Sequence, residues 1–434
     1  MPNGKRKSMT IEVVKINRGK SLFYFVLGLL LLFQINLQQA VGVFQYLDEG
    51  VAVLCLFLLL GQLLVRRQTD RAELICLTCM VLAVAEGLVC TRVAGVQTNW
   101  KPVLMDIGNT FKSFLVLLGM LHCGLSEKEL EKIFANLALV VRALVYVGCV
   151  CAVVSQFVNI GMRYDVRHGL HSFQFIYTHA ALLNIMCYSF VVIQTVDLKV
   201  HRQNRFSLLC TMFLWASTLR VRAFFYVVVY VLLAWLILRR KGKRLPMPAK
   251  FGVGAVLAAA AAVIARDQFQ YYFGAGSRTP RYALVRGGIR TFLHYFPLGS
   301  GFGTYGSYAA RKYYSPLYYQ YGFTHVWGLS PRYNSLLTDN YWPSVMAQLG
   351  LIGLVLMVLL LAAIVRFTLR VTQDQPYERL AALTGLICVY VASVATDSFS
   401  HYTTVAVFFF AALAMQKACA ANRAESNDTL QRGK

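Results

Sequence analysis

The sequence is poor in charge. Only 14% of its 434 residues are Asp, Glu, Lys or Arg, whereas about 25% is usual in soluble domains. Apolar residues make up 57% of the chain. This balance excludes a soluble globular enzyme, a disordered chain and a coiled coil. Uncharged runs recur along the sequence at lengths that suit bilayer spans, which indicates one bundle of membrane helices.

Motifs for disulfides and bound cofactors are also missing. The 11 cysteines lie mostly in apolar runs, and the CxxC pair of Cys76 and Cys79 has no second pair. We interpret them as buried thiols. A glycine-rich stretch near residue 300 lacks the Gly-Lys-Ser/Thr of a Walker loop. The sequence therefore predicts no disulfide framework, and we expect no bound cofactor.

The apolar runs predict an all-α polytopic membrane protein with about twelve transmembrane helices. The first run follows a basic tail, residues 1–20, but no small-residue cleavage site closes it, so we expect an uncleaved helix. The twelve spans cover approximately residues 22–37, 50–65, 74–90, 103–121, 134–157, 175–196, 206–219, 223–238, 251–265, 341–365, 380–394 and 403–415.

Lysine and arginine orient these spans, because in short loops they gather on the cytoplasmic side. With the basic tail inside, the clusters within 66–71, 128–132, 199–205, 239–244 and 366–370 and the basic C-terminal tail fall on that side as well. Arg163 and Arg167, in a shorter loop, and Arg220 and Arg222, at a hairpin tip, fall on the outer side. The sequence thus predicts a multi-pass inner-membrane protein with both termini cytoplasmic. Nine spans lie within residues 21–265, three lie within 340–417, and 418–434 form a cytoplasmic tail.

One long extracytoplasmic loop, residues 266–339, departs from this charge rule. It holds eight Lys or Arg against two Asp, a net charge of +6, and seven of the eight are arginine. It also holds 12 of the chain's 24 tyrosines. Arginine suits bidentate phosphate binding, and aromatic rings suit sugar faces and membrane interfaces alike. A loop solvated beside anionic headgroups is the simpler alternative.

The ligand that fits both features is an amphiphile with a phosphate or pyrophosphate at the membrane surface and sugars above it. An undecaprenyl-pyrophosphate-linked glycan is the obvious bacterial candidate. An extracytoplasmic loop argues against nucleic acid, although arginine with aromatics also suits that partner. The candidate site residues are Arg163, Arg167, Arg220, Arg222, Arg281, Arg286, Arg290, Gly301, Tyr305, His325 and Asp339.

Each motif has a plainer alternative. The glycines from 299 to 306 would let backbone N–H groups approach an anion, or form only a flexible turn. Arg286 and Arg290 would share one helix face, where they either hold an anion between them or are simply solvated. Arg220, at a tight hairpin tip, either snorkels or lines a polar cavity. Asp339 is a helix cap, an arginine partner or a proton acceptor.

These residues resemble the Wzy-type bacterial polysaccharide polymerases, which are related to the O-antigen ligases of the WaaL type. The layout of about twelve spans, with a large outer loop before the last three, covers most of the chain. The Arg-x10-Gly motif described for such polymerases is matched by Arg290 and Gly301. Segments 297–306, 314–318 and 339–343 look like exopolysaccharide polymerases in particular.

The resemblance implies a GT-C-like, metal-independent glycosyltransferase. It would transfer glycan from undecaprenyl pyrophosphate to the acceptor sugar of another lipid-linked repeat, in exopolysaccharide, capsule or O-antigen synthesis. Arg220 and Arg290 are implied as the first ligands of the donor pyrophosphate. The further arginines are Arg222, Arg281 and Arg286 for the same group, and Arg163 and Arg167 for substrate retention.

Two other functions stay open. Ligases carry a His-Asn pair where Asp339-Asn340 stands here, so a ligase that moves glycan to a lipid or protein ranks second. A lipid-linked oligosaccharide flippase or transporter ranks third, because no internal repeat is visible. For a polymerase, a chain-length regulator and a flippase of the same pathway are the expected partners.

Overall fold

The computed structural model describes residues 17–66, 70–201, 204–239, 279–394 and 396–432. Most of these residues are helical. The predicted ninth span, 251–265, and the first part of the outer loop lie outside the described residues. The bundle helices are α1 (Arg18–Leu32), α2 (Gln34–Ala40), α3 (Leu47–Gly61), α4 (Arg71–Ala94), α5 (Trp100–Gly119), α6 (Glu127–Phe157), α7 (Ala180–Asp197), α8 (Arg205–Ser217), α9 (Val221–Ala234), α14 (Tyr341–Val371), α15 (Pro376–Ser393) and α16 (Tyr402–Arg432).

Eight helical segments of the described chain are long and apolar enough to cross a membrane, or nine if α1 and α2, bent by 76°, form one span. The chain is thus a mainly helical, multi-pass membrane protein, as predicted. Each of the other eleven predicted spans falls on a helix. Because α8 and α15 are not among the eight, the count of twelve stays a prediction.

Helix α16 forms the centre of the bundle and packs against α5, α7 and α15. Every residue from Thr403 to Met415 is at most 1% exposed. An apolar sequence on all sides, such as Val405 to Met415, suits a helix that is surrounded by protein rather than by lipid. Lipid-facing side chains occur instead on outer helices such as α6, where Leu139 and Val150 are exposed.

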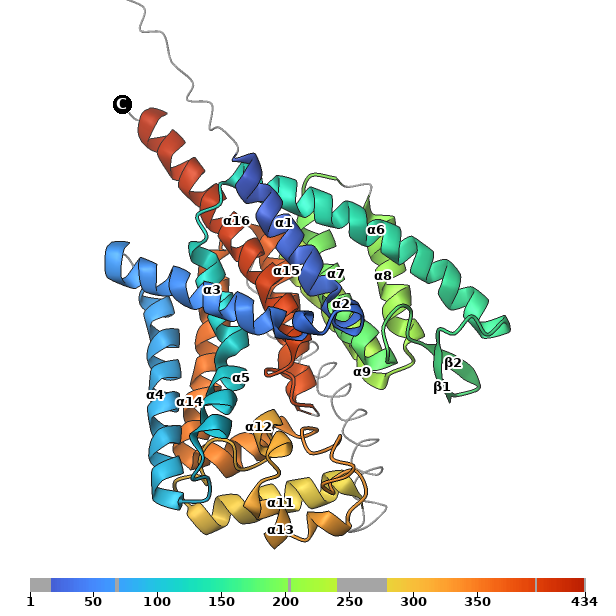
Figure 1. Ribbon diagram of the computed structural model, residues 1–434. Helices are drawn as coiled ribbons and strands as arrows, with labels where there is room; N and C mark the ends of the chain where they lie inside the picture. Colours follow the sequence, from blue (N-terminus) through green and yellow to red (C-terminus); the bar gives the residue numbers. More distant parts are fainter. Residues whose placement is uncertain (1–16, 67–69, 202–203, 240–278, 395, 433–434) are drawn as a thin grey trace, which may run out of the picture.

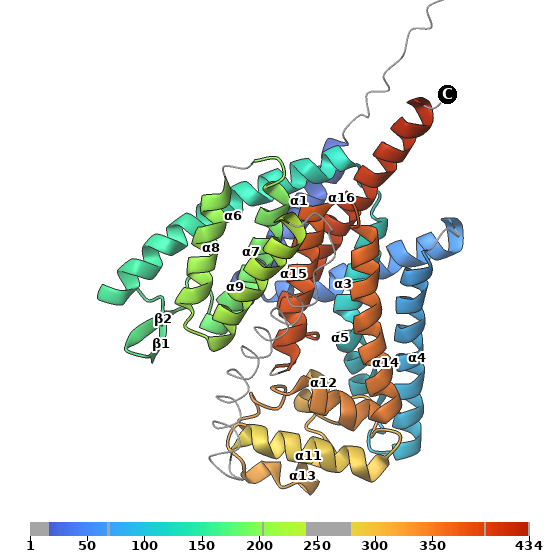
Figure 2. The same cartoon turned by 180° about the vertical axis from the view of Figure 1, so that it is seen from behind.

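Helix α11 (Pro280–Tyr295) and two short helices, α12 (Tyr308–Lys312) and α13 (Pro316–Gln320), gather at one end of the bundle. We call the described residues 279–340 the cap. Figures 1 and 2 show the cap at the end opposite to that from which the C-terminal part of α16 extends. The later part of the predicted outer loop therefore forms a compact, partly helical unit.

A small β-hairpin occupies the shorter loop after α6, where the sequence indicated only a loop. Its strands are β1 (Arg163–Arg167) and β2 (Leu170–Phe173), paired antiparallel. The turn between them has His168 and Gly169 at positive φ, 51° and 78°. Two positive φ values are typical of the type I′ turn that joins tight hairpins.

Helix α14 is broken at Gly350, whose φ of 62° and ψ of −157° are not helical. The segment 297–301 enters this break. Ser300 N–H donates to Ala347 O at 2.8 Å, and Leu351 N–H donates to Pro297 O at 2.9 Å. These bonds satisfy backbone groups that the break frees, which a membrane interior requires. The cap is therefore attached to the bundle through the broken helix.

Candidate functional site

The glycine-rich segment is packed into the bundle rather than open to a ligand. Every backbone N–H from Gly299 to Thr304 already donates to a protein acceptor. In chain order the acceptors are Cys90 Sγ, Ala347 O, Gln348 O, Thr91 Oγ1, Asp106 Oδ2 and Gln348 Oε1. A Cβ on Gly301 would lie 2.3 Å from Thr91 Cα. We therefore replace the anion-cradle interpretation of Gly301 with a packing role.

Tyr305 lies in the core of the cap. Its side chain is 1% exposed, its hydroxyl donates to Leu284 O at 2.6 Å, and its ring packs edge-on against Tyr318. Tyr318 and Phe323 are equally buried. Some of the loop's tyrosines thus build a second hydrophobic core instead of a sugar-binding face, and we drop Tyr305 from the residues proposed to touch substrate.

Asp339 and Arg281 form an ion pair where the cap meets α14. The guanidinium donates from Nε at 3.1 Å and from Nη2 at 2.9 Å, both to Asp339 Oδ2. The N-cap of α14 is Asn340, so Asp339 is not the helix cap. Asn340 instead donates its amide to Arg281 O at 3.4 Å. Of the roles predicted for Asp339, arginine pairing is the one that this geometry displays.

Arg286 and Arg290 project from α11 and are exposed. Arg290 lies over the Tyr321 ring, 5.5 Å from its centroid, and within the described chain neither arginine has a carboxylate partner. His325 is exposed as well. These guanidinium groups are therefore accessible to an anion from outside the cap.

A second arginine group lies at the β-hairpin. Arg167 Nε donates to Asp165 Oδ2 at 2.9 Å, and Arg220 Nη2 lies 3.6 Å from the same oxygen. The Arg220 guanidinium also faces the Tyr164 ring at 5.5 Å. Burial, and then the positive charge of Arg167, lower the pKa of Arg220. Buried Nε and Nη2 of Arg220 have no hydrogen-bond acceptor among the described residues.

The remaining predicted arginines differ in role. Arg163 donates from Nη2 to Gln156 O at 3.0 Å and from Nε to Ser155 O, so it satisfies carbonyls in the last turn of α6. Arg222 is half-buried at the start of α9. The hairpin and the cap lie toward the same end of the bundle in Figures 1 and 2, but no ion pair or hydrogen bond joins Arg220 to the cap arginines within the described residues.

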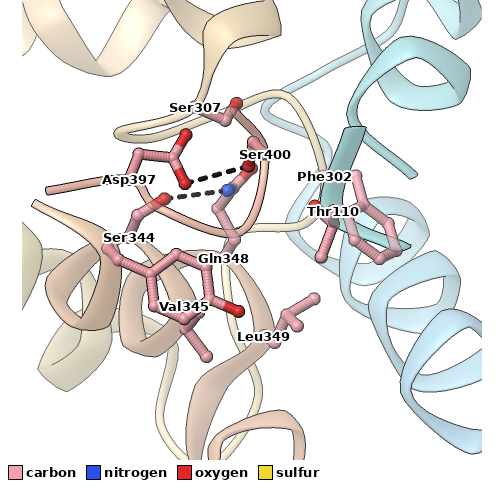
Figure 3. Close-up of a pocket in the computed structure, with 10 residues that line it drawn as sticks. Thr110, Phe302, Ser307, Ser344, Val345, Gln348, Leu349, Asp397 and Ser400 are labelled. Atoms are coloured by element: carbon pink, nitrogen blue, oxygen red, sulfur yellow. Dashed lines mark hydrogen bonds between the residues drawn. The ribbon is translucent and has the colours of Figure 1, made fainter. Parts of the chain in front are cut away.

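A cavity of about 20 Å³ with both polar and apolar lining residues, room for one water molecule, lies beneath the cap. Its walls come from α5, the first part of α14, the glycine-rich segment and residues 397–400. Figure 3 shows two hydrogen bonds in its lining. The Ser400 hydroxyl donates to Asp397 Oδ1 at 2.9 Å, and Gln348 Nε2 donates to Ser344 Oγ at 3.1 Å. The lining residues are Thr110, Phe302, Ser307, Tyr341, Ser344, Val345, Gln348, Leu349, Asp397 and Ser400.

Asp397 is the functional candidate that the sequence reasoning missed. Burial, helped by the nearby Asp106 carboxyl, raises the pKa of Asp397 to about 7. Its backbone N–H donates to Thr338 O at 3.3 Å, which places it beside the Asp339 turn. The sequence contained a feature that could have pointed to Asp397 as a site residue, because it is a carboxylate in a polar outer loop between the last two predicted spans.

Fold and site together define a multi-pass helical membrane protein with a group of arginines and the carboxylates of Asp106, Asp339 and Asp397 toward one end. Within the described residues, no three His, Cys, Asp or Glu side chains lie close enough to hold a metal ion. No protein-family model matches the chain. No curated protein matches it either.

Proposed function

We propose that this protein is a polysaccharide polymerase of the bacterial inner membrane. It transfers glycan from undecaprenyl pyrophosphate to the acceptor sugar of a second lipid-linked repeat at the outer face. The observation that carries this proposal is Arg220, half-buried, whose Nε and Nη2 make no hydrogen bond among the described residues, although Nη2 lies 3.6 Å from Asp165 Oδ2. Leaving buried donors unpaired costs free energy, which a bound diphosphate oxygen would remove.

We infer that other arginines toward the same end of the bundle add positive charge for the leaving group. Arg167 stands beside Arg220 through their shared contact with Asp165. Arg286 and Arg290 offer two more guanidinium groups from α11 that no carboxylate of the described chain neutralises. Fixed cations lower the barrier when the negative charge on the leaving oxygen grows in the transition state.

The reaction needs a proton acceptor as well as cations. The acceptor sugar hydroxyl attacks the anomeric carbon, the bond from that carbon to the pyrophosphate oxygen breaks, and the hydroxyl proton must leave. Oxygen Oδ2 of Asp339 already accepts two hydrogen bonds from Arg281. Asp397, with a pKa of about 7, is suited to accept a proton at neutral pH. We assign Asp397 as the base and Asp339 as a positioning residue.

A strain that lacks this protein tests the proposal in cells. A single lipid-linked repeat should accumulate at the outer leaflet, because repeats still arrive there but cannot be joined. Restoring the protein should restore a ladder of longer chains. Accumulation of the repeat at the inner leaflet would contradict the proposal, since it would indicate a defect in transport rather than in polymerisation.

A further inference from the structure

A second cavity, of about 450 Å³, lies far from the cap, between the start of α6, the end of α7 and α16. Figure 1 places these helix ends at the end of the bundle opposite the cap. Its volume is within the range of small-molecule sites. We call it the lysine cavity. Its lining residues are Lys128, Glu131, Lys132, Phe134, Ala135, Val196, Asp197, Val200, His201 and Lys417.

Cations outnumber carboxylates around the lysine cavity. Lys417, 1% exposed, binds Glu378 at 2.7 Å, and Lys199 lies 3.7 Å from that same carboxylate. One buried carboxylate thus faces two lysines. Lys128 and Lys132 are exposed and have no carboxylate within ion-pair distance in the described chain.

The lining carboxylate of Asp197, at the end of α7, accepts a hydrogen bond on each of its two oxygens. Its oxygens accept from the His201 ring at 3.0 Å and from the Asn204 amide. Asn204 in turn accepts from Arg142 Nη1 at 2.8 Å, which brings another cation to the network. Glu131, the other lining carboxylate, lies 4.0 Å from Lys417 Nζ. Both lining carboxylates thus already face cations or hydrogen-bond donors, whereas Lys128 and Lys132 have no carboxylate partner in the described chain.

The rest of the lining favours a lipid over a soluble anion. Phe134, Ala135, Val196 and Val200 give the cavity an apolar side. Helix α6, which begins at the cavity, continues with exposed apolar side chains such as Leu139, 62% exposed. A ligand with a charged head and an apolar tail would satisfy both surfaces, as in basic pockets between membrane helices.

We propose that the lysine cavity binds the phosphate headgroup of an anionic membrane phospholipid. Lys128 and Lys132 hold the phosphate, and the apolar wall contacts the start of the acyl chains. The proposal is independent of the polymerase assignment, because the cavity lies at the other end of the bundle from the arginines and Asp397.

Lipid retention on the purified full-length protein tests this site. Native mass spectrometry with added phosphatidylglycerol, and separately with phosphatidylcholine, should show retention of the anionic lipid only. The double variant Lys128→Gln/Lys132→Gln should retain at least about five-fold less phosphatidylglycerol. The control Arg205→Gln/Arg366→Gln removes two exposed cations that do not line the cavity, and it should retain as much as the wild type.

Three results would overturn the proposal. The double variant and the wild type could retain phosphatidylglycerol equally, or phosphatidylcholine could bind as well as phosphatidylglycerol. Free glycerol phosphate at low millimolar concentration could also displace the lipid completely, which would identify a soluble phosphate as the ligand. The variant Lys128→Arg/Lys132→Arg should keep lipid retention, because it keeps both charges.

Discussion

Ser300 of the cap donates its backbone N–H to the carbonyl oxygen of Ala347 inside the break of α14, at a distance of 2.8 Å. This bond joins two segments that are far apart in the sequence and fixes the cap on the bundle. It also explains why glycine occurs on both sides of the junction. A Cβ on Gly299 would lie 2.1 Å from Gln348 O, and one on Gly350 would lie 2.3 Å from Leu298 C.

Replacing Gly350 by alanine should destabilise the protein. Its φ and ψ, 62° and −157°, fall in a region that only glycine adopts readily, with strain of about 1–3 kcal/mol for other residues. The clash with Leu298 adds to this cost. Thermal unfolding in detergent measures the effect. Gly50→Ala in α3, where an added Cβ meets nothing within 4 Å, is the matched control and should be neutral or slightly stabilising.

A melting temperature for Gly350→Ala equal to that of Gly50→Ala would contradict the junction described between the glycine-rich segment and α14. The experiment needs no activity assay, so it tests the fold separately from the proposed reaction.

Arg281 and Asp339 should be energetically coupled. The side chains are 18% and 24% exposed, so the pair is partly screened, and we expect a coupling of about 1–2 kcal/mol in a double-mutant cycle. Arg281→Gln, Asp339→Asn and the double variant complete the cycle, with the free energy of unfolding as the readout.

Because Asp339 is assigned a positioning role, Asp339→Asn should lower the elongation rate without changing how that rate depends on pH. A lost pH dependence in Asp339→Asn would make Asp339 the base.

Asp397 should make elongation depend on pH. Its carboxylate, the form that accepts a proton, becomes the major form as pH rises through about 7. The elongation rate should therefore increase between pH 6 and pH 8 and then level off, and Asp397→Asn should abolish activity. A rate for Asp397→Asn near that of the wild type would exclude Asp397 as the base.

The same group should affect stability in the opposite direction. The folded state raises the pKa of Asp397 above its ordinary 3.8, so the folded protein binds the proton more tightly than the unfolded chain. The contribution of this group to stability is present at low pH and is lost as pH rises from about 4 to about 7. Asp397→Asn should thus gain melting temperature relative to the wild type at pH 8 but not at pH 4. Asp374→Asn, at an exposed carboxylate, is the control and should show no such gain.

Much of the helical architecture was predictable, because apolar runs longer than a dozen residues leave few alternatives in a bilayer. The positions of the bend after Leu32 and of the break at Gly350 were not, because both fall inside segments, 22–37 and 341–365, that the overall hydropathy presents as single spans. The β-hairpin was missed for a similar reason. Its turn, His168-Gly169, is a short-range signal, but its strands RYDVR and LHSF are too polar and short to stand out.

The candidate site was predictable only as a set of residue types. The arginines and Asp339 can be recognised in the sequence as charged residues of an outer loop. The sequence does not show that Arg281 pairs with Asp339. Whether Gly301 and Tyr305 meet a ligand or the core depends on contacts with Thr91 and Leu284, which only the folded chain defines. Asp397 had a local signal, but its elevated pKa arises from burial beside Asp106.

The most direct test of the central claim is elongation by purified protein in liposomes supplied with lipid-linked repeat. Wild-type protein should produce a glycan ladder without nucleotide sugar. Arg220→Gln should lower the rate by about 10²–10³-fold if the guanidinium stabilises the leaving pyrophosphate as an oxyanion donor does, and Arg220→Lys should fall between the two. Arg332→Gln, an exposed cap arginine outside the proposed site, should elongate normally. A full ladder from Arg220→Gln, or no ladder from the wild type, would contradict the account.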